Sequence, residues 1–188
     1  MAAGTAAVVL AAGGGTRFVG PTHKLLAPLV DGRCIVEHAV GAAAAAGLDD
    51  VIVVRGAVEL PAFGAEVTVV DNPAWAEGLA SSVQAALAAA GAAGHGAVVV
   101  GLGDQPFVTP EAWRLVAAAT STPVAVATYA GQRGNPVRLA RAVWARLPTS
   151  GDEGARSLLR GEPSLVTEVP CPGSAADIDT LEDLRTWS

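Results

Sequence analysis

The residues Val8 to Arg17, VVLAAGGGTR, join a short apolar run to three consecutive glycines near the start of the chain. An uninterrupted run of apolar, β-branched residues is typical of a parallel strand that is buried on both faces. Glycine has no Cβ, so the following turn can bring its backbone close to an anion and direct several N–H groups at it. The stretch therefore predicts a buried first strand that opens into an anion-binding turn, as in α/β proteins.

Outward from this stretch, valine-rich runs alternate with longer amphipathic or alanine-rich segments, which is the pattern of βαβ units. The predicted strands are Ala6–Ala11, Val51–Arg55, Val67–Asp71, Ala97–Gly101 and Val124–Tyr129, with weaker ones at Pro136–Leu139 and Leu165–Val169. The predicted helices are Ile35–Ala46, Leu79–Ala90, Pro110–Ala119, Arg141–Leu147, Gly154–Arg160 and Leu181–Trp187. The pattern predicts one α/β domain over residues 1–188, three-layered, with a mostly parallel sheet and helices on both faces.

Helix-capping residues support two of these helices. Thr109 precedes Pro110 and Glu111, which gives an N-cap, a proline at the first helical position and an acid in the first turn. Asp179 and Thr180 precede the last helix in a similar way. An N-cap is therefore one ordinary explanation for Asp179.

Composition narrows the class of protein. The 188 residues are 51% hydrophobic and 16% charged, with a formal net charge of −6, so a packed core is expected and a basic nucleic-acid-binding surface is not. Cys34 and Cys171 are far apart and form no CxxC pair, which favours a reducing compartment such as the cytoplasm. No apolar run reaches the ~18 residues of a membrane span, and no basic residue precedes the apolar stretch in Met1–Leu10, so we expect neither a membrane segment nor a cleaved signal.

Two common phosphate-binding motifs do not fit the glycine turn. A Walker pattern that starts at Gly15 reaches Gly20, but Pro21 stands where it requires lysine. A dinucleotide-binding GxGxxG that starts at Gly13 places Phe18 at its third glycine.

The charged residues after the glycines suggest a catalytic loop. Lys24 is the only lysine among 12 basic residues, and it follows Arg17 on the same loop. A guanidinium and an ammonium group together can neutralise a triphosphate and the charge on its leaving group. The simpler alternative is a glycine turn with solvated charges, and the solitary lysine favours the catalytic reading.

Asp104 follows the predicted strand Ala97–Gly101. The carboxyl ends of strands are where open α/β sheets bind ligands, and Mg²⁺ takes one or two carboxylates together with phosphate oxygens. Asp104 is therefore a candidate metal ligand. The alternative is that it caps a turn before Pro106.

Taken together, these motifs resemble those of the molybdenum cofactor cytidylyltransferases, within the family of molybdopterin nucleotidyltransferases. The resemblance spans nearly the whole chain, although Arg17 and Lys24 lie seven positions apart where the family has about five, and Asn135 stands in place of the usual histidine. The matching segments, in chain order, are Leu10–Arg17 with Lys24; Asn72, Pro73, Trp75, Gly78, Leu79 and Ser82; Gly103–Pro106 (GDQP); Gly134, Pro136 and Val137; Gly151, Asp152 and Gly154–Arg156; and Asp177–Thr180.

The resemblance implies a nucleotide-diphospho-sugar transferase fold and Mg²⁺-dependent transfer of CMP from CTP to a molybdopterin-type acceptor. It implies catalytic roles for Arg17, Lys24 and Asp104, and a metal held by Asp104 together with Asp179 or Asp177. The nucleotide-binding residues would be Leu10, Ala11, Ala12, Gly13, Gly14, Gly15, Thr16, Arg17, Lys24, Asn72, Gly78, Ser82 and Asp104. The acceptor-binding residues would be Arg133, Gly134, Asn135, Pro136, Asp152 and Arg156.

Several alternatives stay open. Guanylyltransferase relatives tend to carry LAGG and GDMP, so Ala12 and Gln105 favour cytidine over guanosine. The acceptor could instead be a sugar phosphate, or the chain could be a non-catalytic protein that binds the cofactor and delivers it to a molybdoenzyme. Among other residues, His23 could touch a phosphate, and Trp113, Trp144 and Trp187 are expected to be packing residues.

Overall fold

Seven strands form one central sheet in the computed structural model, which describes residues 4–186. The strand order is β3-β2-β1-β4-β6-β5-β7, and only β6 runs antiparallel to its neighbours. The strands are β1 Thr5–Ala11, β2 Asp50–Arg55, β3 Val67–Asp71, β4 Ala97–Leu102, β5 Val124–Tyr129, β6 Gln132–Ala140 and β7 Val166–Pro170.

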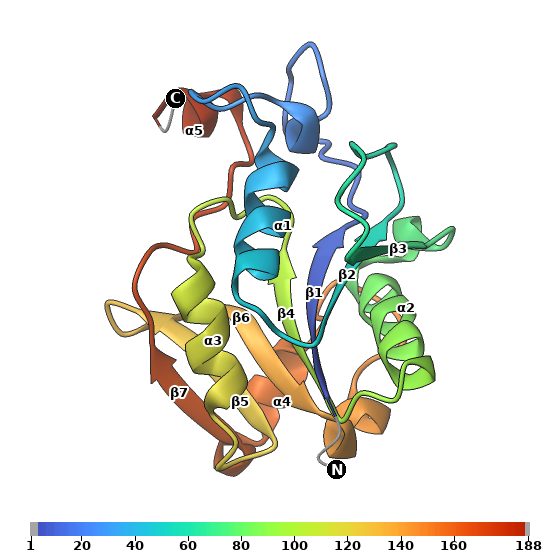
Figure 1. The fold of residues 1–188 in the computed structure, drawn as a ribbon, viewed down its shortest axis with the longest axis vertical. Coiled ribbons are helices and arrows are strands. Elements are labelled where there is room, and N and C mark those ends of the chain that lie inside the picture. The colour runs from blue at the N-terminus through green and yellow to red at the C-terminus, as the bar shows by residue number, and fades with distance from the viewer. Residues whose placement is uncertain (1–3, 187–188) are drawn as a thin grey trace.

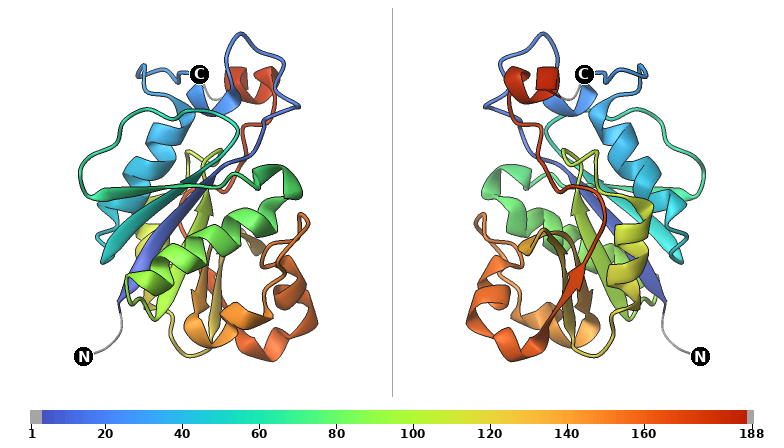
Figure 2. Two further views of the ribbon diagram at one scale, coloured as in Figure 1. Left: turned by 90° about the vertical axis from the view of Figure 1, so that its right-hand side faces the viewer. Right: turned by 90° about the vertical axis from the view of Figure 1, so that its left-hand side faces the viewer.

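Helices cover both faces of the sheet (Figures 1 and 2). One face packs against α1 (Ile35–Ala45) and α3 (Pro110–Ala118), and the other against α2 (Leu79–Ala92) and α4 (Arg156–Gly161). The short helix α5 (Leu181–Thr186) lies apart from both faces, beside the long loop that follows β1. The predicted fold class, a three-layer α/β structure with a mostly parallel sheet, is confirmed.

The register of β1 and β4 brings the two strongest sequence motifs together. Both strands are buried, run parallel and pair Leu10 with Leu102. The N–H of Gly103 then donates a hydrogen bond of 2.8 Å to the carbonyl oxygen of Leu10. The glycine turn after β1 and Asp104 after β4 consequently leave the sheet side by side.

Some predicted elements differ from the structure. Strand β6 is longer than Pro136–Leu139 and forms a hairpin with β5, through Ala130 and Gly131, whose φ angles are 49° and 80°. The segment Arg141–Arg146 is a 3₁₀ helix. Helix α4 begins at Arg156 because Gly154 has a φ of 50°, outside the right-handed helical region. The predicted end of the last helix, Trp187, lies outside the described residues.

The structure has neither a membrane-spanning helix nor a disulfide among its described residues. Within residues 4–186, no helix has the length and apolar character needed to cross a bilayer. Cys34 and Cys171 are both free thiols.

Candidate functional site

His23 stabilises the glycine turn through a hydrogen bond to its backbone. Its Nδ1 accepts a hydrogen bond from the N–H of Leu25, so the proton lies on Nε2, which donates to the carbonyl oxygen of Gly13 at 3.1 Å. Burial lowers the pKa of His23, which keeps the ring neutral in this role. Gly15 has a φ of 58°, and a Cβ there would lie 3.0 Å from the His23 ring and 3.1 Å from Lys24 Cγ. The glycine thus lets both side chains pack under the turn.

Lys24 joins two carboxylates that are far apart in the sequence. Its Nζ lies 2.6 Å from Asp104 Oδ2 and 2.7 Å from Asp179 Oδ1. Burial alone would lower the pKa of Lys24, but the carboxylate of Asp104, with that of Asp179, outweighs it and raises the pKa. Arg17 pairs with the other oxygen of Asp179 at 2.8 Å. The structure therefore gathers two cations and two carboxylates at the mouth of the glycine turn.

The C-terminal segment is held there by a buried residue. Ile178 has no exposed surface, packs with Phe18, Ala27 and Ile35, and donates its N–H to the carbonyl oxygen of Asp104 at 3.0 Å. Its two neighbours face different groups: Asp179 contacts Lys24, whereas Asp177 accepts a hydrogen bond from Gln105.

The helix-cap explanation for Asp179 does not hold. Thr180 caps α5, since its Oγ1 accepts a hydrogen bond of 3.1 Å from the N–H of Asp183. The side chain of Asp179 is instead committed to Lys24 and Arg17.

The donor set fits a hard divalent cation. Asp104 Oδ1 is buried and has no hydrogen-bond partner among residues 4–186, which leaves a carboxylate oxygen free to bind an ion. In the same part of the chain, no three His, Cys, Asp or Glu side chains are grouped so as to hold a metal by themselves. Mg²⁺ needs only one or two protein carboxylates when phosphate oxygens and water complete its shell. Asp104 and Asp179 would be those carboxylates.

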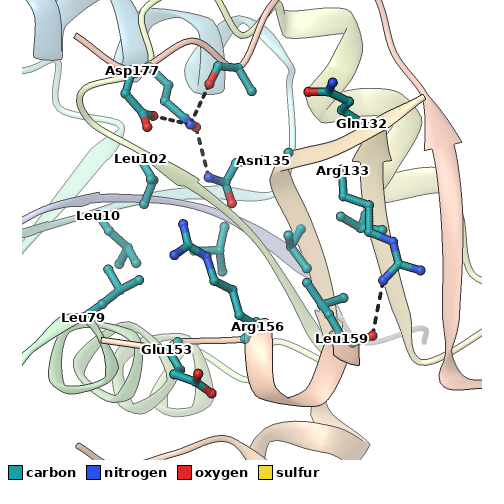
Figure 3. Close-up of a pocket in the computed structure, with 18 of the residues that line it drawn as sticks. Leu10, Leu79, Leu102, Gln132, Arg133, Asn135, Glu153, Arg156, Leu159 and Asp177 are labelled. Carbon is teal, nitrogen blue, oxygen red and sulfur yellow. Dashed lines mark hydrogen bonds between the residues drawn. The ribbon is translucent and has the colours of Figure 1, made fainter. Parts of the chain in front are cut away.

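Two cavities share Leu10, near the end of β1, and Leu79, the first residue of α2, in their walls. The smaller, of about 290 Å³, is lined by the turn itself and by the segment that begins α2. The larger, of about 630 Å³, is lined by residues of β4, β6 and α4, some of which are drawn in Figure 3.

The smaller cavity contains six of the thirteen predicted nucleotide-binding residues, and Trp75 forms part of its wall. The predicted residues that line it are Leu10, Ala12, Gly13, Gly14, Gly78 and Ser82. Ala11, Gly15 and Thr16 line neither cavity. Asn72 is also absent from the walls: it is buried, and its Nδ2 donates to the hydroxyls of Ser81 and Ser82 at 2.9 and 3.0 Å. Asn72 therefore positions Ser82 rather than facing the cavity.

The larger cavity contains four of the six predicted acceptor residues, namely Arg133, Gly134, Asn135 and Arg156. The other two lie elsewhere: Pro136 is buried within β6, and Asp152 lines the smaller cavity, where it accepts a hydrogen bond of 3.3 Å from the N–H of Leu79. Asp152 lies there because the segment Gly151–Asp152 packs against Gly78.

The arginines of the larger cavity differ in their partners. Arg133 pairs with Glu168 at 2.8 Å, and Arg160 pairs with Glu153. Arg156 has no side-chain partner among the described residues, and its guanidinium group points into the cavity (Figure 3). An unpaired cation at this place can bind an anionic group of a ligand.

Sequence reasoning did not assign Gln105 or Asp177 to the larger cavity. Gln105 is 5% exposed and lies in its wall together with Asp177, which is open to solvent on one side. Burial of the other side and the nearby carboxylate of Asp104 raise the pKa of Asp177. Gln105 belongs to the GDQP motif, but nothing in that motif indicates which cavity its amide faces.

Comparisons with known proteins agree on the family. The sequence model of the MobA-like NTP transferase domain matches residues 7–168. A nicotine blue oxidoreductase of Paenarthrobacter nicotinovorans is 32% identical over 94% of this chain and 93% of its own length. A nucleotidyl transferase from Methanothermobacter is 27% identical, with a TM-score of 0.81 over 98% of this chain and 96% of its own. Mycobacterium tuberculosis Rv0371c, solved as a complex with manganese, is 28% identical, with a TM-score of 0.75 over 100% and 98% of the two chains.

Proposed function

The chain belongs to the family of MobA-like NTP transferase domains and is a nucleotidyltransferase, and on this premise we propose that it transfers CMP from CTP to the terminal phosphate of a molybdopterin-type acceptor. One observation carries the proposal: Lys24 joins Asp104 and Asp179 at the mouth of the glycine turn. Charges of both signs at the carboxyl end of a buried strand suit a triphosphate and its cation.

The reaction needs no protein nucleophile. An oxygen of the acceptor phosphate attacks the α-phosphorus of the nucleotide, a new P–O bond forms, and the bond to the β-phosphate oxygen breaks to release pyrophosphate. The N–H groups of Gly13–Gly15, with Arg17 and Lys24, bind the triphosphate and stabilise charge on the leaving pyrophosphate. Mg²⁺ held by Asp104 and Asp179 would neutralise phosphate charge when it is bound.

The smaller cavity would receive the nucleoside. Ala12 lines it and is therefore placed to affect the choice of base, which supports CTP because the motif LAAG favours cytidine. Gln105 lines the larger cavity, so the base preference rests on Ala12 alone. GTP is the alternative nucleotide.

The larger cavity would receive the acceptor. Its walls combine apolar side chains with polar ones, and Arg156 supplies an unpaired cation that suits a phosphate group. A sugar phosphate is the alternative acceptor, although the apolar side chains suit a ring system better. Reduced cysteines support a reaction in the cytoplasm, and the product could pass from this enzyme to a molybdoenzyme.

A different candidate comes from the relative that is named as an oxidoreductase. A redox reaction in this chain would need a bound electron carrier such as a nicotinamide or a flavin. Incubation with NADPH and an organic dye, followed by absorbance at 340 nm, tests this possibility, and dye-dependent NADPH oxidation would favour it over nucleotidyl transfer.

Release of pyrophosphate tests the main proposal. The protein is incubated with Mg²⁺, each of the four ribonucleoside triphosphates and either a molybdopterin or a sugar phosphate. We expect release with CTP and molybdopterin, and a delivery protein would release none with any pair. Asp104→Asn should reduce turnover at least about 100-fold, because it removes a charge that holds the cation, while thermal unfolding stays two-state. Near-normal turnover by Asp104→Asn would contradict the assigned site. Asp49→Asn is the control, because it makes the same chemical change at an aspartate that is not part of the site.

A further inference from the structure

The amide of Gln105 has only one possible orientation. Its Nε2 lies 2.9 Å from the carbonyl oxygen of Ala175 and 2.6 Å from Asp177 Oδ1. A backbone carbonyl can only accept a hydrogen bond, so the group facing it must be the NH₂, whatever the protonation of Asp177. The oxygen Oε1 of Gln105 therefore faces the other way, toward β6.

This orientation determines that of Asn135. Gln105 Oε1 can only accept, and it lies 3.0 Å from Asn135 Nδ2. Since the amide nitrogen of Asn135 is committed to Gln105, the oxygen Oδ1 is the group left for the cavity (Figure 3). It has no partner among residues 4–186. The backbone is fixed as well, because Tyr129 donates its hydroxyl to the carbonyl oxygen of Asn135 at 2.7 Å.

We infer that Asn135 is a specificity-determining residue that presents a hydrogen-bond acceptor to the larger cavity, and that Gln105 is the residue that holds it so. The inference rests on the proposed function, because it describes the acceptor of that reaction. A ligand that fits must place an N–H or O–H donor against Asn135, since a carbonyl or ring nitrogen there would face another acceptor.

The other groups of the cavity complete the description of the ligand. Arg156 offers charge-assisted donors to an anion, and aliphatic side chains such as Val137, Leu139 and Leu159 offer flat apolar contact. The structure thus assigns to the cavity a flat heterocycle that has a donor edge and a separate anionic substituent. A pterin ring with an acidic side group has this chemistry.

Two small fluorescent or absorbing probes test the inference without turnover. Pterin-6-carboxylate has an N–H donor edge and an anion, whereas quinoxaline-2-carboxylate has similar rings and the anion but no N–H group. We expect the wild-type protein to bind the pterin about tenfold more tightly than the quinoxaline, as measured by calorimetry. Asn135→Leu should abolish this preference and leave quinoxaline binding nearly unchanged.

Gln105→Leu tests the positioning role, because it leaves Asn135 in place but frees its amide to rotate. We expect it to reduce the preference at least about threefold. Gln132→Leu is the matched control, since Gln132 is an amide in the wall of the same cavity without a part in this network, and it should keep the preference. Asn135→Ala is a second variant in case Asn135→Leu does not fold, as judged by circular dichroism.

The outcomes separate this inference from the proposed function. CTP binding with Mg²⁺ is measured in parallel by tryptophan fluorescence, because Trp75 lines the smaller cavity. If CTP binds but the two probes bind equally, or if neither binds, the inference about Asn135 is overturned and the transferase proposal stands. If CTP does not bind, the transferase proposal fails, and a donor preference that depends on Asn135 still supports the inference.

Discussion

The ammonium group of Lys24 occupies the space between two carboxylates that would otherwise repel each other. Without a cation, Asp104 and Asp179 would face one another in a partly buried place, where charges interact more strongly than in water. A divalent cation at the same carboxylates would have to displace this ammonium group or share the carboxylates with it. In the proposed reaction, Lys24 would thus compete with a metal in the absence of nucleotide and would be freed for the phosphates once the metal is bound.

This competition predicts opposite effects of one substitution on metal binding and on turnover. Lys24→Met removes the charge and keeps the length of the side chain, so Mn²⁺ should bind the nucleotide-free protein at least about tenfold more tightly. Turnover should nevertheless fall about 100-fold or more, because the leaving pyrophosphate loses a cation. The free Mn²⁺ signal in electron paramagnetic resonance gives the first quantity, and pyrophosphate release gives the second.

A residue on α3 provides a control for the effect of removing any one positive charge from the protein. Arg114 lies on the surface and donates to the carbonyl oxygen of Ala45, so Arg114→Met removes one positive charge away from the site. It should change neither Mn²⁺ affinity nor turnover by more than about twofold. If Lys24→Met bound Mn²⁺ no more tightly than the wild-type protein does, the lysine and the metal would not compete.

Asp31 gives a prediction about pH. The hydrogen bond from Arg33, aided by His38, lowers the pKa of Asp31 from 3.8 to about 2. A carboxyl group whose pKa is lower in the folded state contributes stability above its unfolded pKa and loses it as the pH falls through the folded value. Asp31→Asn should therefore lower the melting temperature at pH 7, and the difference from wild type should disappear between pH 4 and pH 2.

The matched control for this titration is Glu66→Gln, since Glu66 is exposed and its side chain has no ion pair among the described residues. Melting curves recorded by circular dichroism across the pH range measure both variants. A deficit of Asp31→Asn that stays constant down to pH 2 would mean that the carboxylate contributes nothing through its charge.

At the scale of elements, the start of α2 forms one wall of the smaller cavity and depends on a buried amide. Asn72 is 4% exposed, donates to Ser81 and Ser82, and accepts a hydrogen bond of 3.0 Å from the N–H of Ala74. Asn72→Ala leaves that N–H without its acceptor, so the free energy of unfolding should fall by about 1–3 kcal/mol. The KM for CTP should rise because Ser82 loses its support, while the KM for the acceptor should not.

Urea unfolding and steady-state kinetics measure these effects. Gln84→Ala, on the same helix, removes a single hydrogen bond to the carbonyl oxygen of Pro148 and should cost about 1 kcal/mol or less, with no change in KM. If Asn72→Ala raised both KM values equally, the amide would be acting on the whole fold rather than on the nucleotide side.

The elements differ in how well the sequence predicts them. Buried parallel strands such as β1 and β4 are continuous apolar runs, so their positions follow from the pattern of apolar residues along the sequence. The start of β6 cannot be located from an apolar run, because Gln132 and Arg133 are polar residues that extend beyond the packed part of the sheet. The direction of β6 could not be predicted either, since a strand's own sequence does not reveal whether its neighbours are parallel.

The site shows the same division. The convergence of Asp104 and Asp179 follows from a family motif, and in the structure both contact one ammonium group although 75 residues separate them in the sequence. The displacement of Asp152 to the smaller cavity depends on how Gly151 packs on Gly78, a contact between distant segments that no local pattern shows. The orientation of Gln105 likewise depends on the carbonyl oxygen of Ala175, which lies 70 residues away.

At the scale of the whole molecule, the loop after β1 meets the C-terminal segment above the sheet (Figure 1). The loop after β1 and the segment before α5 share a small apolar cluster in which Ile178 is fully buried. The cluster is separate from the two large cores on either face of the sheet, so its stability comes from few contacts. Such a region is expected to open locally more often than the strands.

Ligand binding at the glycine turn should therefore protect the C-terminal segment from hydrogen exchange, although the two are far apart in the sequence. Triphosphate and Mg²⁺ would bind the turn and Asp179 together, and a ligand that binds only the closed form shifts the opening equilibrium toward it. Hydrogen–deuterium exchange with mass spectrometry should show slower exchange at Ile178, whose N–H donates to Asp104, when CTP and Mg²⁺ are present. At a ligand concentration one hundred times its Kd, the opening free energy should rise by up to about 2.7 kcal/mol.

Strand β7, which lies earlier in the same C-terminal region but at the far edge of the sheet, is the internal control, and its exchange should not change. Protection of the glycine turn with unchanged exchange at Ile178 would show that the nucleotide binds without Asp179, and that the glycine turn and the C-terminal segment do not form one site.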